Sequence, residues 1–402
     1  MVGLHRIRCV IVSLLALLAT ATGCRGKRQA ETHAGPAAAS QVVVAARTAA
    51  SSRAVAPGAS SAPTQQASAS ASGSGAVALR PPAATLPCKA ARVGQPVSLG
   101  TRTDQVVAIQ AWGNQIYLLS HQQVNARTTL SSFPRDGGTS QQVGRYEGLG
   151  EPQSFRVTRD GAYFTQRRAL LRIPLGGGAP ETVAADFAAV ATVAGRHAYG
   201  IRCGSPQLQD QVLRISAAGG VAEPIAAIQR ETKTCRYGDV AIAEGTVFAT
   251  DWEGRRVLAV DLSSGKVTVL TSGHPFAASL FVSARYVDFS ASDGLRRVPR
   301  AGGKAEKLAT MGTSPWDAVA FDGADFWIYD AAPYEQEHVW RLAGGGGDPD
   351  RIYSFHVQDV LGSGAVGMTV DDQCFYYTQR SPAGDFATLF AQKKPPHDAA
   401  AR

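Results

Sequence analysis

Short runs of alternating apolar and polar residues fill the chain from about residue 95 onwards, and each run stops at a turn that contains Gly or Asp. Runs of this length with a period of two predict β-strands. The run at residues 155–158, for example, reaches a turn at residues 160–161 before an aromatic run at residues 163–164. No segment has a sustained helical period with helix caps, so helical repeats are excluded. The pattern predicts an all-β protein.

A nine-residue hairpin pattern recurs six times, and in each copy a strand-like run meets a Gly-containing turn. The copies begin at residues 132, 172, 214, 259, 297 and 341. Gly suits these tight turns because they need a positive φ. A second hairpin lies upstream of each copy, so each repeat has four short strands. Four strands in roughly 42 residues are typical of a β-propeller blade.

Seven upstream hairpins can be counted, but only six Gly-rich hairpins follow them. The upstream hairpins turn near Gly113, Gly161, Gly195, Gly245, Arg285, Gly323 and Asp372. The seventh blade has a third strand at residues 387–391 and then a polar tail. We predict its missing outer strand at residues 95–100, because one N-terminal strand can close the ring and cover the sheet edge. The sequence therefore predicts a seven-bladed β-propeller of four-stranded blades, with six blades as the main alternative.

The first residues resemble an export signal. A basic start precedes an uncharged run of about 14 residues, which is shorter than the roughly 20 that a membrane span needs. The sequence Ala21-Thr22-Gly23-Cys24 resembles the bacterial lipobox. This resemblance implies cleavage before Cys24 and lipid attachment at Cys24, which would anchor the protein to a membrane. The alternative is a soluble secreted protein that is cut near Ala21.

Residues 24–86 are rich in Ala, Ser, Pro, Gly and Gln. They contain too little apolar surface to offset the entropy of ordering, so we predict a disordered tether. The predicted organisation is a signal peptide at 1–23, the tether at 24–86 and the propeller domain at 87–402. The net charge of the chain is +8, and eight basic residues lie in residues 1–86 beside a single acid, Glu31. The propeller itself is therefore nearly neutral, and no nucleic-acid partner is expected.

Six cysteines occur, and four of them lie in the predicted propeller domain. An oxidising compartment and an even number of cysteines fit two disulfides. Cys88 precedes the closing strand and Cys374 enters the blade that this strand closes, whereas Cys203 and Cys235 lie at strand ends of neighbouring blades. The propeller arrangement therefore predicts the pairs Cys88–Cys374 and Cys203–Cys235. Four buried free thiols are the alternative.

Catalytic motifs are absent from the sequence: it has no P-loop, H-E-x-x-H or G-x-S-x-G, and no catalytic residue, metal or cofactor is assigned. Residues 362–367 match G-x-G-x-x-G, but an extended run follows where a dinucleotide site needs a helix. Residues 334–338 offer Glu and His as metal-ligand types, although a solvated loop is the expected structure. Three arginine pairs are expected on solvated mid-blade turns: Arg167-Arg168, Arg255-Arg256 and Arg296-Arg297.

Polar and aromatic residues gather in the loops that are expected on one face of the ring. The candidate ligand-binding residues are Arg156, Arg236, Tyr237, Asp239, Asp251, Trp252, His274, Trp316, Asp317, Tyr334 and Glu335. One interpretation is a polar ring that binds a small molecule, glycan or peptide. The other is structural, because Asp often caps a loop by accepting backbone N–H groups. For any single residue we favour the structural interpretation.

The hairpin at residues 297–303 has the pattern Arg-aliphatic-Pro-x-x-Gly-Gly, which resembles bacterial surface lipoproteins with TolB-like or NHL-like propellers. The resemblance covers roughly residues 95–392 and implies an architecture, because such folds have many unrelated functions. Our leading hypothesis is a membrane-anchored, non-enzymatic binding or scaffold module for an envelope protein, peptide or glycan. We expect it to be a monomer. The alternatives are a streptogramin-lyase-like or lactonase-like enzyme with an axial metal, and a passive cell-surface protein.

The location that these features favour is the cell envelope, facing the periplasm or the cell surface. Arg25 follows Cys24, and no Asp stands at that position. Under the enterobacterial sorting pattern, this favours lipid anchoring in the outer membrane.

Overall fold

A computed structural model describes most of the predicted propeller domain. The described residues are 86–90, 97–102, 104–204, 209–310, 318–331, 336–356, 365–380 and 387–395. The predicted signal peptide, Cys24 and nearly all of the predicted tether lie outside them. Among the described residues there is no helix with the length and apolarity that a membrane crossing requires.

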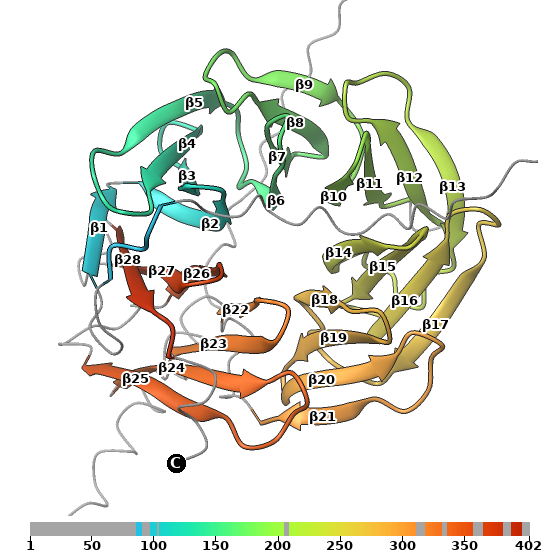
Figure 1. Cartoon of the computed structure of the whole chain (residues 1–402). Coiled ribbons are helices and arrows are strands. Elements are labelled where there is room, and N and C mark those ends of the chain that lie inside the picture. Colours follow the sequence, from blue (N-terminus) through green and yellow to red (C-terminus); the bar gives the residue numbers. More distant parts are fainter. Residues whose placement is uncertain are drawn as a thin grey trace, which may run out of the picture. The chain divides into compact units, whose positions relative to one another are not determined.

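Seven four-stranded antiparallel sheets form a ring in the described part of the chain (Figure 1). We number these blades 1 to 7 in chain order. Blades 1 and 2 contain β2 (Gln105–Trp112), β3 (Gln115–Gln122), β4 (Arg127–Pro134), β5 (Gln141–Glu147), β6 (Gln153–Val157), β7 (Ala162–Gln166), β8 (Ala169–Ile173) and β9 (Glu181–Ala184). Blades 3 and 4 contain β10 (Val190–Ala194), β11 (His197–Arg202), β12 (Asp210–Ser216), β13 (Glu223–Ile228), β14 (Tyr237–Ala243), β15 (Thr246–Asp251), β16 (Arg256–Asp261) and β17 (Val267–Ser272).

The remaining blades follow the same order. Blades 5 and 6 contain β18 (Leu280–Val282), β19 (Tyr286–Ala291), β20 (Gly294–Pro299), β21 (Glu306–Ala309), β22 (Ala318–Phe321), β23 (Asp325–Ala331), β24 (Gln336–Ala343) and β25 (Asp350–His356). Blade 7 contains β26 (Ala365–Val370), β27 (Cys374–Arg380), β28 (Ala387–Lys393) and β1 (Val97–Arg102). The prediction of seven four-stranded blades is therefore confirmed.

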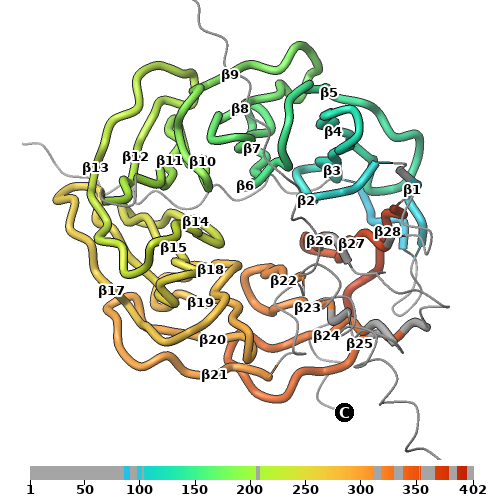
Figure 2. Tube along the Cα trace, turned by 180° about the vertical axis from the view of Figure 1, so that it is seen from behind, coloured from blue at the N-terminus to red at the C-terminus, as the bar shows by residue number. Residues whose placement is uncertain are grey.

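The N-terminal strand β1 closes the ring, as predicted. It pairs antiparallel with β28, and Val97 lies opposite Ala391. Blade 7 consequently has the strand order β1-β28-β27-β26, and both views show β1 beside β28 (Figure 1 and Figure 2). This pairing covers the edge of β28 that would otherwise present free backbone N–H and C=O groups.

The Gly-rich hairpins of the sequence repeat join the third and fourth strands of the blades. In blade 5, Gly302 and Gly303 have φ angles of 87° and 135°, which residues with a Cβ rarely adopt. The N–H of Gly302 donates to the carbonyl of Pro299 at 2.8 Å and closes the turn. The glycine pairs at the same place in blades 1, 2, 3 and 6 also have positive φ angles. One turn type therefore explains five of the six copies of the pattern, whereas the turn of blade 4 has the single glycine Gly265.

Apolar side chains pack between neighbouring blades, as the alternating pattern requires. At the junction of blades 6 and 7, Trp327 stacks on Phe375 with ring centroids 5.2 Å apart, and both side chains are fully buried. At the junction of blades 3 and 4, the contacts are mainly aliphatic and include Val212, Val240 and Leu258. Burial of these faces is the main favourable contribution to the stability of each junction.

Side-chain hydrogen bonds also link the innermost strands of successive blades. The side chain of Gln110 accepts from the N–H of Val157 at 2.7 Å and donates to its carbonyl at 3.3 Å. Three other inner-strand side chains accept a backbone N–H of the next blade: Thr369 from Ala111, Ser154 from Ala191 and Asp239 from Leu280. These bonds satisfy backbone donors inside the ring and fix the spacing of the inner strands.

Candidate functional site

The two faces of the ring carry different connections. We call the upper face the one with the connections between blades and the loops that join second to third strands. The lower face carries the turns that join first to second and third to fourth strands. Because strand direction alternates within each blade, the loops that contain Arg236, Trp252 and His274 all lie on the upper face.

Arg156 and Asp239 form an ion pair between the innermost strands of blades 2 and 4. Nη2 of Arg156 lies 3.0 Å from Oδ1 of Asp239. The same carboxylate accepts the N–H of Val240 at 2.8 Å and the N–H of Leu280 at 3.1 Å. Asp239 thus joins three blades, and its bonds agree with the structural interpretation of this residue.

Arg236, Trp252 and Phe276 form a stacked group on the upper face, which we call the aromatic platform. Cζ of Arg236 lies 4.1 Å from the ring centroid of Trp252, and Trp252 meets Phe276 edge-on with centroids 5.5 Å apart. The Phe276 side chain is 45% exposed, and its φ of 57° is unfavourable for a bulky residue. An exposed aromatic residue with a strained backbone is typical of a recognition surface.

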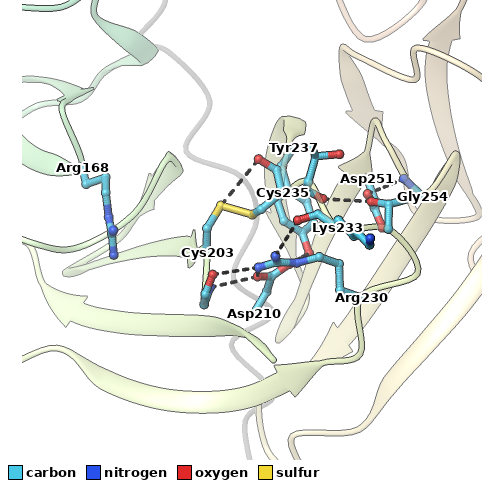
Figure 3. Close-up of a disulfide and its surroundings, with 12 residues drawn as sticks. Arg168, Cys203, Asp210, Arg230, Lys233, Cys235, Tyr237, Asp251 and Gly254 are labelled. Carbon is cyan, nitrogen blue, oxygen red and sulfur yellow. Dashed lines mark hydrogen bonds and ion pairs between the residues drawn. A yellow bond between two sulfur atoms is a disulfide. The ribbon is translucent and has the colours of Figure 1, made fainter. Parts of the chain in front are cut away.

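The Cys203–Cys235 disulfide, shown in Figure 3, fixes the loop in which Arg236 follows Cys235. This predicted pair is present, with Cα atoms 5.8 Å apart. Beside it, Asp210 is fully buried, forms an ion pair with Arg230 and accepts the Tyr237 hydroxyl at 3.0 Å. Burial, reinforced by the charge of Asp210, raises the pKa of Tyr237, so its hydroxyl stays protonated and donates. Tyr237 therefore supports the loop as a buried residue, because its hydroxyl donates to Asp210.

Arg256 is buried, which corrects the expectation that the Arg255-Arg256 pair is a solvated turn. Nη2 of Arg256 lies 2.6 Å from Asp251, and Nη1 lies 2.8 Å from Glu231. Asp251 in turn accepts the N–H of Gly254 at 2.8 Å. These contacts of Arg256 hold the loop of Trp252 and the connection before Arg236 together, so Arg256 links the two loops of the aromatic platform and Asp251 holds Arg256 in place.

The Arg296-Arg297 pair also differs from its expected place in a turn. Both residues lie within β20, and Arg297 forms an ion pair with Asp288, whose side chain is 1% exposed. The pairing partner stands on the neighbouring strand β19, nine residues earlier in the sequence. A pair of arginines in sequence therefore does not indicate a solvated turn when a buried acid faces one of them.

His274 belongs to the same connection as Phe276, but its ring is bonded within the blade. Nε2 of His274 lies 3.0 Å from the Thr271 hydroxyl, and its ring lies 5.3 Å from the ring of Phe289. Burial and the nearby charge of Arg296 lower the pKa of His274, with a smaller opposing effect of Asp293. The ring is therefore neutral near pH 7 and contributes no charge to the upper face.

One group of metal-ligand types comes together in the described part of the chain: ligand atoms of Cys203, Asp210 and Cys235 lie within 4.8 Å of one another. Both sulfur atoms form the disulfide, and the carboxylate is paired with Arg230. All three side chains are thus already bonded, the two cysteines to each other and Asp210 to Arg230. The remaining candidate residues lie outside the described residues: Trp316, Asp317, Tyr334 and Glu335.

A cavity of about 630 Å³ opens on the lower face at the junction of blades 6 and 7. Its lining residues are Pro87, Cys88, Ala90, Asp325, Trp327, Asp372, Gln373, Lys393, Lys394 and Pro395. Cys88 and Cys374 form the second predicted disulfide, with Cα atoms 6.3 Å apart, at its wall. None of the ligand-binding residues predicted from the sequence lines this cavity.

Asp322 and Lys394 form a buried ion pair beside this cavity, and the ammonium also lies 5.3 Å from the ring centroid of Trp327. Burial alone would raise the pKa of Asp322. Hydrogen bonds from the backbone of Asp325 and from the side chains of Lys394 and Trp327 outweigh burial and lower this pKa to about 2. The folded protein therefore favours the charged carboxylate.

We expect Asp322→Asn to lower the free energy of unfolding by about 2 kcal/mol at pH 7, because each pKa unit is equivalent to about 1.4 kcal/mol. The folded-state pKa lies below the ordinary value of 3.8, so the stabilisation is complete above that value and is lost as the pH falls through about 2. Urea unfolding at pH 7, 5, 3 and 2 measures this difference. Asp160→Asn, an exposed lower-face substitution, is the control. If the wild type and Asp322→Asn differ in free energy of unfolding by the same amount at every pH, the lowered pKa of Asp322 is contradicted.

Neither Phe276 nor the lower cavity was predicted from the sequence. A signal existed for Phe276, because it ends the sequence Gly273-His274-Pro275-Phe276 in a connection between blades, where an aromatic residue is not needed for a strand. No local signal marks Lys394, which lies in the polar tail and contacts Asp322 only in the closed ring.

Comparisons with known proteins concern the fold. No protein-family model matches the chain, and no curated protein matches its sequence. Raptor from Chaetomium thermophilum resembles it at 9% identity and a TM-score of 0.52, over 74% of this chain and 30% of Raptor. A puromycin-hydrolyzing peptidase from Mycobacterium tuberculosis resembles it at 12% identity and a TM-score of 0.50, over 74% of this chain and 53% of the peptidase. A putative TolB from Agrobacterium tumefaciens has 16% identity and a TM-score of 0.40, over 64% of this chain and 95% of that protein.

These identities are too low to assign a family or an activity, because propellers have many unrelated functions. The TolB-like and NHL-like kinship remains a resemblance of the repeat pattern. The two disulfides are typical of a protein outside the cytosol. By its architecture, the chain is a seven-bladed β-propeller.

Proposed function

We propose that the chain is a membrane-anchored propeller outside the cytoplasm that binds an envelope protein, peptide or glycan through its upper face. In this proposal, lipid at Cys24 holds the protein on the membrane, the outer membrane being favoured, and the tether separates the propeller from the bilayer. The binding module is non-enzymatic and monomeric, and it needs no cofactor.

The observation that carries this proposal is the aromatic platform. Trp and Arg are enriched among the residues that dominate binding energy at interfaces. Here Arg236 covers one face of Trp252, while Phe276 stands exposed beside it on a left-handed backbone. The disulfide at Cys235 fixes the loop in advance, so little ordering entropy is lost when a partner binds.

An enzyme with an axial metal is the alternative that the sequence leaves open. It would need His and acidic side chains that converge near the axis. The inner-strand acid Asp239 is instead paired with Arg156 and two backbone N–H groups. This arrangement favours the binding module, because a metal would have to displace an arginine from its ion pair.

We expect Trp252→Ala to reduce capture of the partner from the native envelope at least about 10-fold, because truncating an interface anchor costs 2 kcal/mol or more. The measurement is quantitative recovery of proteins and glycans on the full-length anchored chain, with and without a chelator of divalent cations. Val221→Ala, an 89% exposed lower-face position, is the matched control. Equal recovery by the wild type and Trp252→Ala would contradict the proposal, and partner loss on chelation alone would favour the metal enzyme.

A further inference from the structure

A second cavity opens on the upper face between blades 2 and 3, away from the aromatic platform of blades 4 and 5. Its volume is about 210 Å³, and its lining residues are Glu151, Gln153, Thr165, Arg167, Arg168 and Ala189. The hydroxyl of Thr165 lies 3.1 and 3.0 Å from the carbonyl oxygens of Gln153 and Ala189, and the two acceptors share its single proton. These two bonds tie blade 2 to the connection into blade 3 and give the cavity a fixed base.

Arg167 and Arg168 form the whole turn between β7 and β8. Gln166 pairs with Ala169, so two residues remain in the turn, and their φ angles are 49° and 71°. Positive φ at both positions defines a type I′ turn, which strongly prefers Asn-Gly. Arginine at both positions is unfavourable, because the Cβ crowds the backbone in this region. The turn is therefore not optimised for stability.

Backbone strain is concentrated around this cavity. Ser154, directly after the lining residue Gln153, also has a positive φ of 51°, at a bulge in β6. Three of the seven non-glycine residues with positive φ in the described part of the chain thus lie at this one place. Strain of this kind often clusters at ligand-binding and active sites.

The charges at the cavity are only partly paired. Within the described ranges, no carboxylate lies at ion-pair distance from Arg167, whose side chain lies against Gly150. Arg168 pairs with Asp186 at 3.0 Å, but both side chains are about half exposed, so this pair is weak and can exchange. Glu151 adds one exposed carboxylate to the same wall. The lining of the cavity therefore holds two cations and one anion, and Asp186 pairs with Arg168 beside it.

We propose that this cavity binds a small zwitterionic ligand, whose carboxylate is held by Arg167 and Arg168 and whose ammonium group lies near Glu151. The planar guanidinium matches a carboxylate in a bidentate geometry. Glu151 disfavours a phosphate dianion and favours a ligand with a positive group next to its carboxylate. Two sources share this chemistry: a free amino acid and the ends of a short peptide.

Calorimetric titration of the full chain with L-alanine, tri-alanine and inorganic phosphate distinguishes these sources. Saturable binding of L-alanine alone assigns the site to free amino acids, and binding of tri-alanine alone assigns it to peptide ends. Phosphate is expected to bind more weakly than either zwitterion. If neither zwitterion binds, or if phosphate binds more tightly, the proposal is overturned.

The double variant Arg167→Asn with Arg168→Gly separates binding from folding, because Asn-Gly is the preferred sequence for this turn. We expect the melting temperature to rise by about 2 °C or more, while affinity for the zwitterion falls about 10-fold or more. Glu151→Gln should weaken binding independently of the turn.

Two substitutions are the controls. Ala126→Gly relieves a φ of 49° in blade 1, and Arg159→Asn removes an exposed lower-face cation.

Both controls should leave binding of the zwitterion unchanged. Unchanged affinity in the double variant would overturn the proposed role of the two arginines. A lower melting temperature of the double variant would overturn the argument from strain. The aromatic platform is not altered in any of these variants, so failure here leaves the proposed function of the upper face standing.

Discussion

Alanine at both Cys88 and Cys374 is expected to lower the free energy of unfolding by about 5 kcal/mol. The bridge joins residues that are 286 positions apart, so it restricts almost the whole propeller in the unfolded chain. The entropy of closing such a loop increases with its length. The bridge also holds the segment before β1, where the N–H of Lys89 donates to the carbonyl of Arg135 at 3.0 Å. Without it, closure of the ring depends on the pairing of β1 with β28.

Denaturant unfolding under non-reducing conditions measures this effect. Alanine at both Cys203 and Cys235 is the matched comparison, because that bridge spans only 32 positions. Loss of the short bridge is expected to lower the free energy of unfolding by about 3–4 kcal/mol. A cost for the long bridge that is equal to or smaller than that for the short bridge would show that the N-terminal segment does not lock the ring.

Arg135→Ala is expected to lower the free energy of unfolding by about 3–5 kcal/mol, because it leaves the largely buried Asp371 and the buried Tyr376 hydroxyl without their cation. The Arg135 side chain is fully buried. Its Nη2 lies 2.7 Å from Asp371 and 3.3 Å from Asp372, and its Nε donates to the Tyr376 hydroxyl at 3.0 Å. Arg135 follows the third strand of blade 1, whereas its partners belong to blade 7. The substitution therefore weakens the junction at which the ring closes.

The control for this substitution is Arg145→Ala. Arg145 also pairs with an acid, Glu147, but both side chains are largely exposed, so the expected cost is below about 1 kcal/mol. Chemical denaturation of both variants at neutral pH gives the comparison. If the two variants lose a similar free energy of unfolding, Arg135 does not stabilise the buried junction of blades 1 and 7.

Local chemistry made the blades predictable. Each Gly-rich turn needs positive φ, as Gly302 and Gly303 show, and that need is visible in sequence as a repeat. Counting the turns revealed a seventh blade with one strand too few, which identified the closing strand near Val97. The disulfide pairs followed from the same topology, because each joins positions that the ring brings together.

The site could be predicted only in part. Arg236 and Trp252 were both candidates, but their stacking depends on how the start of β14 meets the loop after β15. The partner of Arg156 is Asp239, 83 positions away on another blade, and no periodicity in the sequence indicates that distance. Contacts between blades depend on the twist and tilt of whole sheets, which turn chemistry does not determine.

Two arginine pairs also show that similar sequences can have different structures. Arg167-Arg168 and Arg255-Arg256 look alike in sequence, yet the first pair forms an exposed strained turn and Arg256 is buried against Asp251. The difference arises from the loop length. Two residues separate the strands at Arg167, whereas four separate them before Arg256, which allows Arg256 to be the first residue of a strand with an acid opposite.

The central claim is that the chain carries a propeller outside the cytosol whose ring is closed by β1 and locked by the Cys88–Cys374 disulfide. Non-reducing peptide mapping of the full-length protein, isolated from its native cells after thiols are blocked, tests this claim most directly. We predict that peptides containing Cys88 are joined to Cys374 and those containing Cys203 to Cys235. Labelled free thiols at these four positions, or any other pairing, would contradict the claim.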